Sequence, residues 1–551
     1  MAPRGPQFLL AGALALVAAG GVLAEERGRV QGASTENSAA PNTDVMLDAT
    51  SIAIRDLLAG SDEKNGRLDT RDATAVVEFY NARDYAPAWI PGGVVTDKIR
   101  ALIARIQAAD TDGLDPTDFT LPSPDLGRFA KIQPQVAARA DVMLSRAVAA
   151  YARQAYAGQV DPSTISKNIG YERHLPDLAA ALDSVATSPE PVETLVAYNP
   201  PQPEFAALRE SLAELRRAEE AEKPIEIPPG ATLKLGVEDA RVGFLRQRLD
   251  LPSGVQSPAL YDEAVLAAVK TFQRSAGLKA DGIVGPRTLA ALNADPVDPT
   301  PAILVNMEKW RWMPRDFGRF YVRVNIPDFT VDVYKSDIRT YTTRIVVGKP
   351  TQQTPIFSDE IEHTIVNPAW NVPQSITRNE MLPAARRNPG ALRGYQVFVL
   401  TKGRYRAIDP RRINWRRIDA RRIQIRQPPG RRNALGKVKF MFPNRYSVYL
   451  HDTPSKSLFN RDYRAYSHGC MRVMNPMEFA DALLSEEPKL DSAYLESLYG
   501  SRERRVNLTR KIPVHITYFT AWVDDSGSLQ LRDDLYGHDR RIKERLGVQS
   551  G

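Results

Sequence analysis

Residues 320–348, FYVRVNIPDFTVDVYKSDIRTYTTRIVVG, set the fold of the C-terminal half of this 551-residue chain. In FYVRVN, FTVDVY and TYTTRIVVG apolar and polar residues alternate, which is the pattern of a β-strand with one buried face. Similar segments follow at KVKFMF, SVYLHD and VHITYFTAW. The pattern predicts a β-rich domain over residues 300–523. We favour a β-sandwich or a curled sheet over a fold in which strands and helices alternate.

Helical periodicity dominates the N-terminal half. In residues 141–158, DVMLSRAVAAYARQAYAG, apolar side chains share one face and the pattern ends at a glycine. We expect a helical scaffold domain over residues 44–235. Residues 236–294 predict a separate bundle of three short helices, with Asp262 as an N-cap and Pro286 at the first position of the third helix. The expected fold class is therefore multidomain α+β, because one hydrophobic core cannot serve so long a chain.

The N-terminus has the pattern of an export signal. An apolar run over residues 8–23 follows a basic residue and ends at a small-residue cleavage site. We expect residues 1–24 to be a cleaved signal peptide, with an uncleaved membrane anchor as the alternative. Residues 25–43 are polar and predict a flexible linker. Residues 524–551 are assigned to a C-terminal tail.

Arginine dominates the sequence between Gln374 and Pro428, where the strand alternation fades. We interpret residues 375–427 as an insertion that caps the sheet. From Lys402 to Lys439 there are fourteen Lys and Arg against two Asp, a surplus of twelve that exceeds the net charge of +7 on the whole chain. Such a stretch is either a solvated basic face or a surface that attracts carboxylates. Nucleic acid, the usual partner of basic stretches, is disfavoured for an exported protein.

Cys470 is the only cysteine in the sequence. Exported proteins usually pair their cysteines in disulfides, and a single cysteine has no partner within its chain. Cys470 is therefore either a buried, inert residue or a reactive thiol. Its neighbours favour the reactive thiol: His468 and Gly469 directly precede it in SHGC, and Arg472 follows two residues later. His451 lies nineteen residues upstream, at the end of a predicted strand.

A nucleophilic thiol needs a base, and it needs donors for the oxyanion formed on attack. His451 is the candidate base if a loop returns Cys470 beside it. Gly469 permits a sharp turn, so that its amide and that of Cys470 face a substrate carbonyl. Arg472 is suited to hold a substrate carboxylate. A zinc site made of the two histidines and the thiol lacks a fourth ligand and is disfavoured, so no metal and no cofactor is predicted.

The segments HDTP and SHGCMRV resemble the signature of the L,D-transpeptidases. That signature is a histidine, a spacer of under twenty residues, then Ser/Thr-His-Gly-Cys and a nearby arginine. Residues 236–294 also resemble a peptidoglycan-binding module. Further segments resemble the large multidomain branch of the family, so that the likeness covers nearly all of the chain after the signal: FYNARDYAPAW, AGQVDP, WRWMP, TPIFS, NPAWNVPQSI, QPPGRRNALGKVKFMFPN and YFTAW.

The resemblance implies a role for each motif residue. Cys470 would be the acyl-accepting nucleophile and His451 its general base. Asp452 would orient the imidazole, through either its backbone carbonyl or its side chain. His468 and Gly469 would shape the oxyanion pocket. The implied substrate-binding residues are Arg472, Tyr449, Trp370 and Asn371.

The resemblance also implies a reaction. The thiolate would attack the third-residue carbonyl of a peptidoglycan tetrapeptide stem, release D-alanine, and pass the acyl group to an amine of a second stem. Water as acceptor would give an L,D-carboxypeptidase, and a protein amine would give lipoprotein attachment. A catalytically inert wall-binding scaffold is the alternative from another class. The implied location is the periplasm, with a role in wall organisation and cell shape. The implied partners are peptide stems, glycan strands and other wall-synthesis enzymes, and the implied inhibitors are carbapenems.

Overall fold

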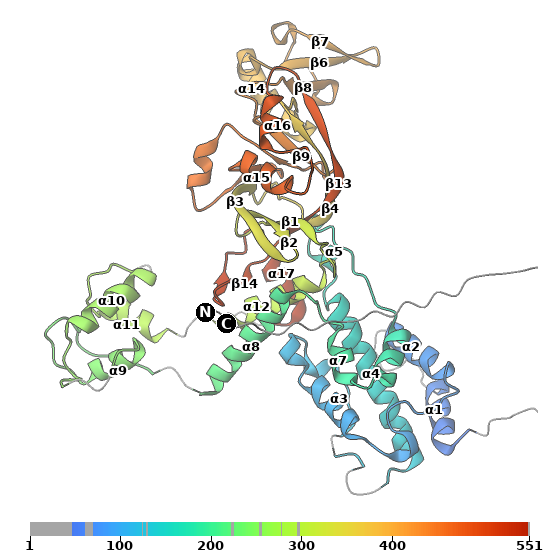
Figure 1. Cartoon of the computed structure of the whole chain (residues 1–551). Coiled ribbons are helices and arrows are strands. Elements are labelled where there is room, and N and C mark those ends of the chain that lie inside the picture. The colour runs from blue at the N-terminus through green and yellow to red at the C-terminus, as the bar shows by residue number, and fades with distance from the viewer. Residues whose placement is uncertain are drawn as a thin grey trace, which may run out of the picture. The chain divides into compact units, whose positions relative to one another are not determined.

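The computed structural model describes the chain between residues 47 and 548, with short gaps (Figure 1). The expected signal peptide (1–24) and linker (25–43) lie outside the described residues. Within the described part, no helix combines the length and apolar character needed to cross a membrane. The described ranges are 47–60, 70–123, 125–127, 131–221, 225–252, 256–276, 278–294 and 298–548.

The N-terminal region is helical, as its periodicity predicts, and packs around one long helix, α4. Its core is rich in alanine, which lets neighbouring helices approach α4 closely. Asp141 of α4 accepts hydrogen bonds from the backbone N–H groups of Trp89 (2.9 Å) and Ile90 (2.7 Å), which fixes the preceding loop to the helix. The helices are α1 (Ala49–Ala59), α2 (Thr70–Asn81), α3 (Asp97–Gln107), α4 (Pro134–Ala157), α5 (Pro162–Ile165), α6 (Leu178–Thr187), α7 (Pro191–Val196) and α8 (Pro203–Ala221), with short 3-10 turns η1 (Pro91–Gly93), η2 (Ala109–Asp112) and η3 (Pro116–Asp118).

The next segment forms the predicted three-helix bundle. Asp262 caps the second helix by accepting the Val265 N–H at 3.0 Å, and Pro286 begins the third helix. Val242, Tyr261 and other apolar side chains fill a small separate core. The helices are α9 (Arg241–Arg248), α10 (Glu263–Ser275) and α11 (Pro286–Asn293).

A nine-stranded sheet that curls back on itself forms the C-terminal half. Its order is β11-β3-β12-β10-β9-β4-β13-β1-β2, and β2 also pairs with β3. The long strand β3 closes the sheet, because its first part pairs with β2 and its last part pairs with β12 and β11. Of the two predicted alternatives, the curled sheet is the one observed. The strands are β1 (Phe320–Asn325), β2 (Thr330–Lys335), β3 (Ile338–Gly348), β4 (Phe357–Val366), β9 (Val438–Met441), β10 (Leu450–His451), β11 (Ala465–Ser467), β12 (Met471–Val473) and β13 (Arg504–Thr517).

Helices and a small two-stranded sheet surround the curled sheet and share its core. Trp310 of α12 stacks on Phe519, with ring centroids 4.4 Å apart. The segment after residue 523, expected from the sequence to be a tail, contains β15 and α17, and Ile542 of α17 is buried in the same core. The elements are α12 (Thr300–Arg311), η8 (Lys456–Asn460), α15 (Pro476–Leu483), α16 (Ser492–Ser497), β14 (Ala521–Val523), β15 (Leu529–Leu531) and α17 (His538–Leu546).

The arginine-rich segment folds as a unit with its own sheet, in the order β5-β8-β6-β7. Its core includes Val397, Trp415 and Ile423, whereas β7 is almost entirely exposed. A wide π-helical turn, η4, interrupts its helical part. The elements are β5 (Trp370–Asn371), α13 (Gln374–Ile376), η4 (Thr377–Met381), α14 (Leu382–Arg387), η5 (Pro389–Leu392), β6 (Gln396–Thr401), β7 (Arg404–Ile408), η6 (Pro410–Arg412), η7 (Ala420–Arg422) and β8 (Ile423–Gln427).

Candidate active site

The alternation of side chains along two neighbouring strands places the Cys470 thiol and the His451 imidazole on one face of the sheet. Strands β10 and β12 are parallel neighbours, with Leu450 opposite Met471 and His451 opposite Arg472. Leu450 and Met471 are fully buried in the core. Because side chains alternate along a strand, His451 and Arg472 lie on the opposite face. Two residues earlier on each chain segment, Tyr449 and Cys470 share that face, and the Met471 N–H donates to the Tyr449 carbonyl at 3.1 Å.

The turn before Cys470 is held by the hydroxyl of Ser467. Ser467 Oγ accepts the Gly469 N–H at 3.1 Å and donates to the Cys470 carbonyl. Gly469 has φ +116°, a backbone conformation that side chains disfavour. The Gly469 amide, one of two expected to face a substrate, is therefore already used inside the turn. This leaves the Cys470 amide as the better candidate for oxyanion binding.

A second hydroxyl network supports the same turn from the protein interior. The fully buried Thr354 donates from Oγ1 to the Gly469 carbonyl (2.8 Å) and accepts the Gly348 N–H (2.9 Å). The Tyr536 hydroxyl donates to the Gly348 carbonyl (2.6 Å) and accepts the Thr354 N–H (3.1 Å). Burial raises the pKa of Tyr536 to about 12, so it remains a donor. Neither side chain could be predicted from the sequence, because the contacts Thr354–Gly469 and Tyr536–Gly348 each join residues more than a hundred positions apart.

His451 is buried, and the backbone of Asp452 determines its tautomer. Nδ1 lies 2.5 Å from the Asp452 carbonyl oxygen. A carbonyl only accepts, so Nδ1 carries the proton and Nε2 keeps its lone pair. The Asp452 carboxylate is engaged elsewhere: it accepts the Lys437 N–H at 2.8 Å and pairs with Lys456 at 2.8 Å. Of the two orienting groups that sequence left open, only the backbone carbonyl contacts the imidazole.

Electrostatics keep the imidazole and the thiol neutral. Burial, reinforced by the nearby Arg472 charge, lowers the pKa of His451 to about 3. Burial raises the pKa of Cys470 to about 11, although hydrogen bonds with Tyr449 and the charge of Lys439 oppose that rise. The thiol is nevertheless partly exposed. The resting site thus holds a protonated sulfur and a neutral base with a free nitrogen.

Tyr449 and Lys439 surround the thiol on the same face. The Tyr449 ring meets the His451 ring edge to face, with centroids 5.7 Å apart. The Lys439 ammonium lies 5.2 Å from the centre of the Tyr449 ring. Burial lowers the pKa of Lys439 and that of Arg472. Lys439 was not among the expected site residues, because its place opposite His451 depends on the antiparallel pairing of β9 and β10.

The remaining expected site residues either contact the insertion or belong to its sheet. His468 Nε2 contacts a carboxylate oxygen of Glu380 in the π-turn η4, so this imidazole joins the turn before Cys470 to the insertion. Trp370 and Asn371 form β5 and pair with β8 of the insertion sheet. Trp370 packs against the core of the insertion, whereas Asn371 is exposed. Among the described residues, no three His, Cys, Asp or Glu side chains lie close enough to hold a metal ion.

Family comparisons agree with this architecture. Residues 319–492 match the L,D-transpeptidase catalytic domain, residues 74–212 match the scaffold domain, and residues 240–292 match the family described as "Putative peptidoglycan binding domain". The chain thus combines an L,D-transpeptidase catalytic domain with a peptidoglycan-binding domain and a helical scaffold.

Individual relatives carry related names. A Haemophilus influenzae protein named "Putative L,D-transpeptidase" is 31% identical over 244 residues, which cover 44% of this chain and 49% of that protein. The chain therefore spans about half the length of this curated relative. An L,D-transpeptidase structure from Mycobacterium smegmatis is 12% identical and covers 36% of this chain and 58% of its own, with a TM-score of 0.18. An L,D-transpeptidase solved with imipenem is 12% identical over 36% of this chain and 59% of its own, with a TM-score of 0.19.

Proposed function

We propose that this protein is a peptidoglycan L,D-transpeptidase in which Cys470 is the nucleophile and His451 the general base. The observation that carries the proposal is the common face of the parallel strands β10 and β12. That face carries a partly exposed thiol, and a neutral imidazole whose Nδ1 is held by a carbonyl. The match of residues 319–492 to the L,D-transpeptidase catalytic domain supports the same chemistry.

In the first half-reaction, His451 Nε2 takes the thiol proton while Sγ attacks the carbonyl carbon of the third residue of a tetrapeptide stem. The Cys470 amide donates to the resulting oxyanion. When the tetrahedral intermediate collapses, the carbon–nitrogen bond breaks, and the imidazolium returns the proton to the departing D-alanine amine. A thioester on Cys470 remains.

In the second half-reaction, an amine of another stem attacks the thioester carbonyl, and His451 removes a proton from that amine. Collapse forms an amide between the third residues of two stems and releases the thiolate, which takes the proton back from the imidazolium. Arg472 and Lys439, on the same face as the thiol, favour a stem carboxylate beside the reacting bond. The cell wall lies outside the cytoplasmic membrane, so the enzyme would act in the periplasm.

The test is intact-protein mass spectrometry after incubation with a carbapenem, together with product analysis on disaccharide-tetrapeptide. We expect one adduct per chain on the wild-type protein and none on Cys470→Ala. We expect His451→Gln to slow adduct formation by about a hundredfold or more, the usual contribution of a positioned base. His174→Ala is the matched control, because this exposed scaffold histidine lies outside the site.

Three outcomes separate the alternatives. Dimeric product linked through third residues supports the transpeptidase. Tripeptide without dimer indicates a carboxypeptidase that uses water. No adduct and no D-alanine release from the folded wild-type protein would overturn the proposal and leave an inert wall-binding protein.

A further inference from the structure

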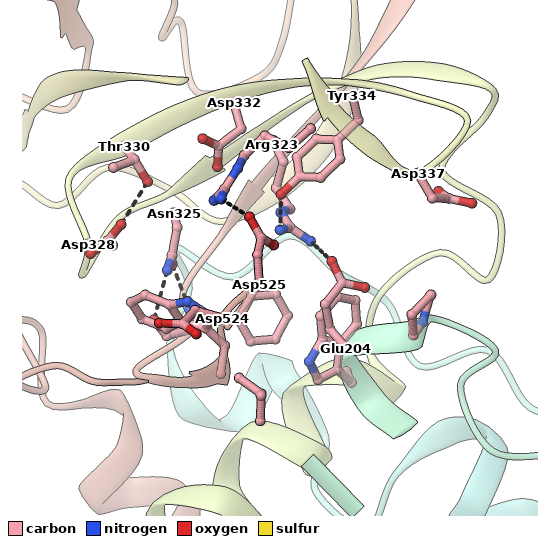
Figure 2. Close-up of a pocket in the computed structure, with 16 residues that line it drawn as sticks. Glu204, Arg323, Asn325, Asp328, Thr330, Asp332, Tyr334, Asp337, Asp524 and Asp525 are labelled. Atoms are coloured by element: carbon pink, nitrogen blue, oxygen red, sulfur yellow. Dashed lines mark hydrogen bonds and ion pairs between the residues drawn. The ribbon is translucent and has the colours of Figure 1, made fainter. Parts of the chain in front are cut away.

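A cavity of about 250 Å³ lies where the β1–β2–β3 strands meet α8, α12 and the β14–β15 hairpin (Figure 2). None of its lining residues belongs to the proposed catalytic face on β10 and β12. Trp310, Phe519 and Trp522 form its apolar wall. The cavity is therefore a candidate binding site separate from Cys470.

Carboxylates dominate the polar lining, and the cations beside them are already used. Arg323 pairs with Glu204 of α8 at 2.6 Å and contacts the Tyr334 hydroxyl, as Figure 2 shows. Arg339 pairs with Asp525. These two are the only arginines among the lining residues, which include no lysine. The lining contains six carboxylates, of which Asp328 pairs with Arg532 from outside the cavity at 2.8 Å: Glu204, Asp328, Asp332, Asp337, Asp524 and Asp525.

Asp332 is the residue that points to a ligand. Its exposed fraction is 5%, and its Oδ1 has no hydrogen-bond partner among the described residues. Arg323 lies directly across the β1–β2 pair from Asp332, but its guanidinium turns to Glu204 instead. Burial raises the pKa of Asp332, although the charges of Arg323 and Arg339 oppose that rise. A buried oxygen without a donor is costly, so a donor that enters this cavity gains the hydrogen bond that the fold leaves unmade.

The chemistry of the lining selects the ligand class. The excess of carboxylates favours a positive charge, and the free oxygen requires an N–H or O–H donor. The aromatic wall suits a short hydrocarbon chain. A bare metal ion is disfavoured, because no three acidic or histidine side chains converge within the described residues. We propose that this cavity binds the primary ammonium group of an aliphatic amine, with Asp332 as its principal acceptor.

The experiment is titration calorimetry on the full chain at low salt. One arm uses 1,5-diaminopentane, and the other uses Nα-acetyl-lysine methylamide, so that a free diamine and an amino-bearing peptide side chain are distinguished. We expect saturable binding of at least one of them, weakened about tenfold or more by Asp332→Asn, since a lost charge-assisted hydrogen bond is worth about this factor. Added salt should weaken the binding further.

Three controls keep the result specific. Asp533→Asn removes an exposed carboxylate of the same C-terminal segment that does not line the cavity, and it should bind as the wild type does. Cys470→Ala should also bind the amine as the wild type does, so this experiment tests the cavity independently of the transpeptidase proposal. 1,5-Pentanediol, a neutral analogue, should not bind. If Asp332→Asn fails to fold, Asp337→Asn, at an exposed lining position, is the second variant and should weaken binding about twofold to threefold.

Absence of saturable amine binding by the wild-type chain would overturn the inference. Equal binding by Asp332→Asn would overturn it as well. Binding of the diol as strongly as the diamine would also overturn it, and would indicate a pocket for neutral sugars or polyols.

Discussion

At the scale of single residues, burial determines the protonation state of the proposed catalytic pair. The pKa of His451 is lowered to about 3 and that of Cys470 is raised to about 11. Between these values the sulfur holds its proton and Nε2 stays free to accept it. The thiolate therefore forms during attack on a substrate and not before it, which protects a partly exposed thiol from adventitious reagents.

The shifted pKa values of His451 and Cys470 predict that the rate of carbapenem adduct formation does not change with pH near neutrality. His451 becomes protonated, and so ceases to act as a base, only as the pH falls toward about 3, and Cys470 ionises only toward about 11. The rate of carbapenem adduct formation should therefore be constant from about pH 5 to about pH 9. Adduct kinetics across that range, read by intact mass, provide the measurement. An inflection near pH 6.5, the ordinary value for histidine, would contradict it.

Thr354 offers a second prediction at this scale. Thr354→Val keeps the shape but removes the hydroxyl that joins Gly348 to Gly469. We expect a loss of stability of about 1–3 kcal/mol, because buried backbone groups lose their partner. We also expect acylation to slow by about tenfold, because the turn that carries Cys470 is less well positioned. Thr354→Ser should restore the acylation rate. Equal rates in both variants would show that the hydroxyl has no positioning role.

At the scale of elements, the C-terminal helix α17 is part of the catalytic fold. Its Asp539 pairs with the buried Lys309 of α12 at 2.5 Å, and Thr520 also contacts this carboxylate. The two charged side chains have exposed fractions of 9% and 5%. Such a pair is costly to bury, and removing one partner costs far more than removing both.

Asp539→Ala should therefore lower the free energy of unfolding by about 3–5 kcal/mol, since it leaves the Lys309 ammonium buried without its ion-pair partner. Urea unfolding followed by tryptophan fluorescence measures this change. Lys309→Met combined with Asp539→Leu should recover most of the loss. A double variant as unstable as the single one would mean that packing, and not charge, explains the effect.

At the scale of the whole molecule, buried polar contacts join the scaffold to the catalytic domain. Glu308 of α12 accepts the N–H groups of Gln159 (2.9 Å) and Val160 (2.8 Å), just beyond the end of α4. Arg311 of α12 donates to the Asp112 carbonyl and lies over the Phe205 ring of α8 at 5.4 Å. The chain enters the three-helix bundle after α8 and leaves it before α12, two helices that share one core. The bundle is thus an insertion between packed helices.

Replacing residues 225–297 with a flexible linker should therefore leave the rest folded. We expect the carbapenem acylation rate to stay within about twofold of the wild type, because Cys470 and its supports are untouched. We expect retention on purified cell-wall sacculi to fall, since residues 240–292 match a peptidoglycan-binding domain. Co-sedimentation with sacculi and adduct kinetics measure the two effects. Unchanged sedimentation would assign wall binding to another part of the chain.

By itself the sequence determined what depends on near neighbours. Alternation in residues 320–348 predicted strands, and Asp262 and Pro286 marked helix starts. The motif around Cys470 led to the proposal that its thiol and His451 act together. Only the tertiary structure decided that the sheet curls closed, that the Asp452 backbone carbonyl contacts the imidazole, and that Thr354 and Tyr536 bond to the backbone of Gly469 and Gly348. It also showed that Asp332 Oδ1 is buried with no hydrogen-bond partner among the described residues. The physical reason is the separation, along the chain, of the residues that interact. Periodicity and capping act within a few residues, whereas burial and these hydrogen bonds join groups whose separation along the chain leaves no local pattern.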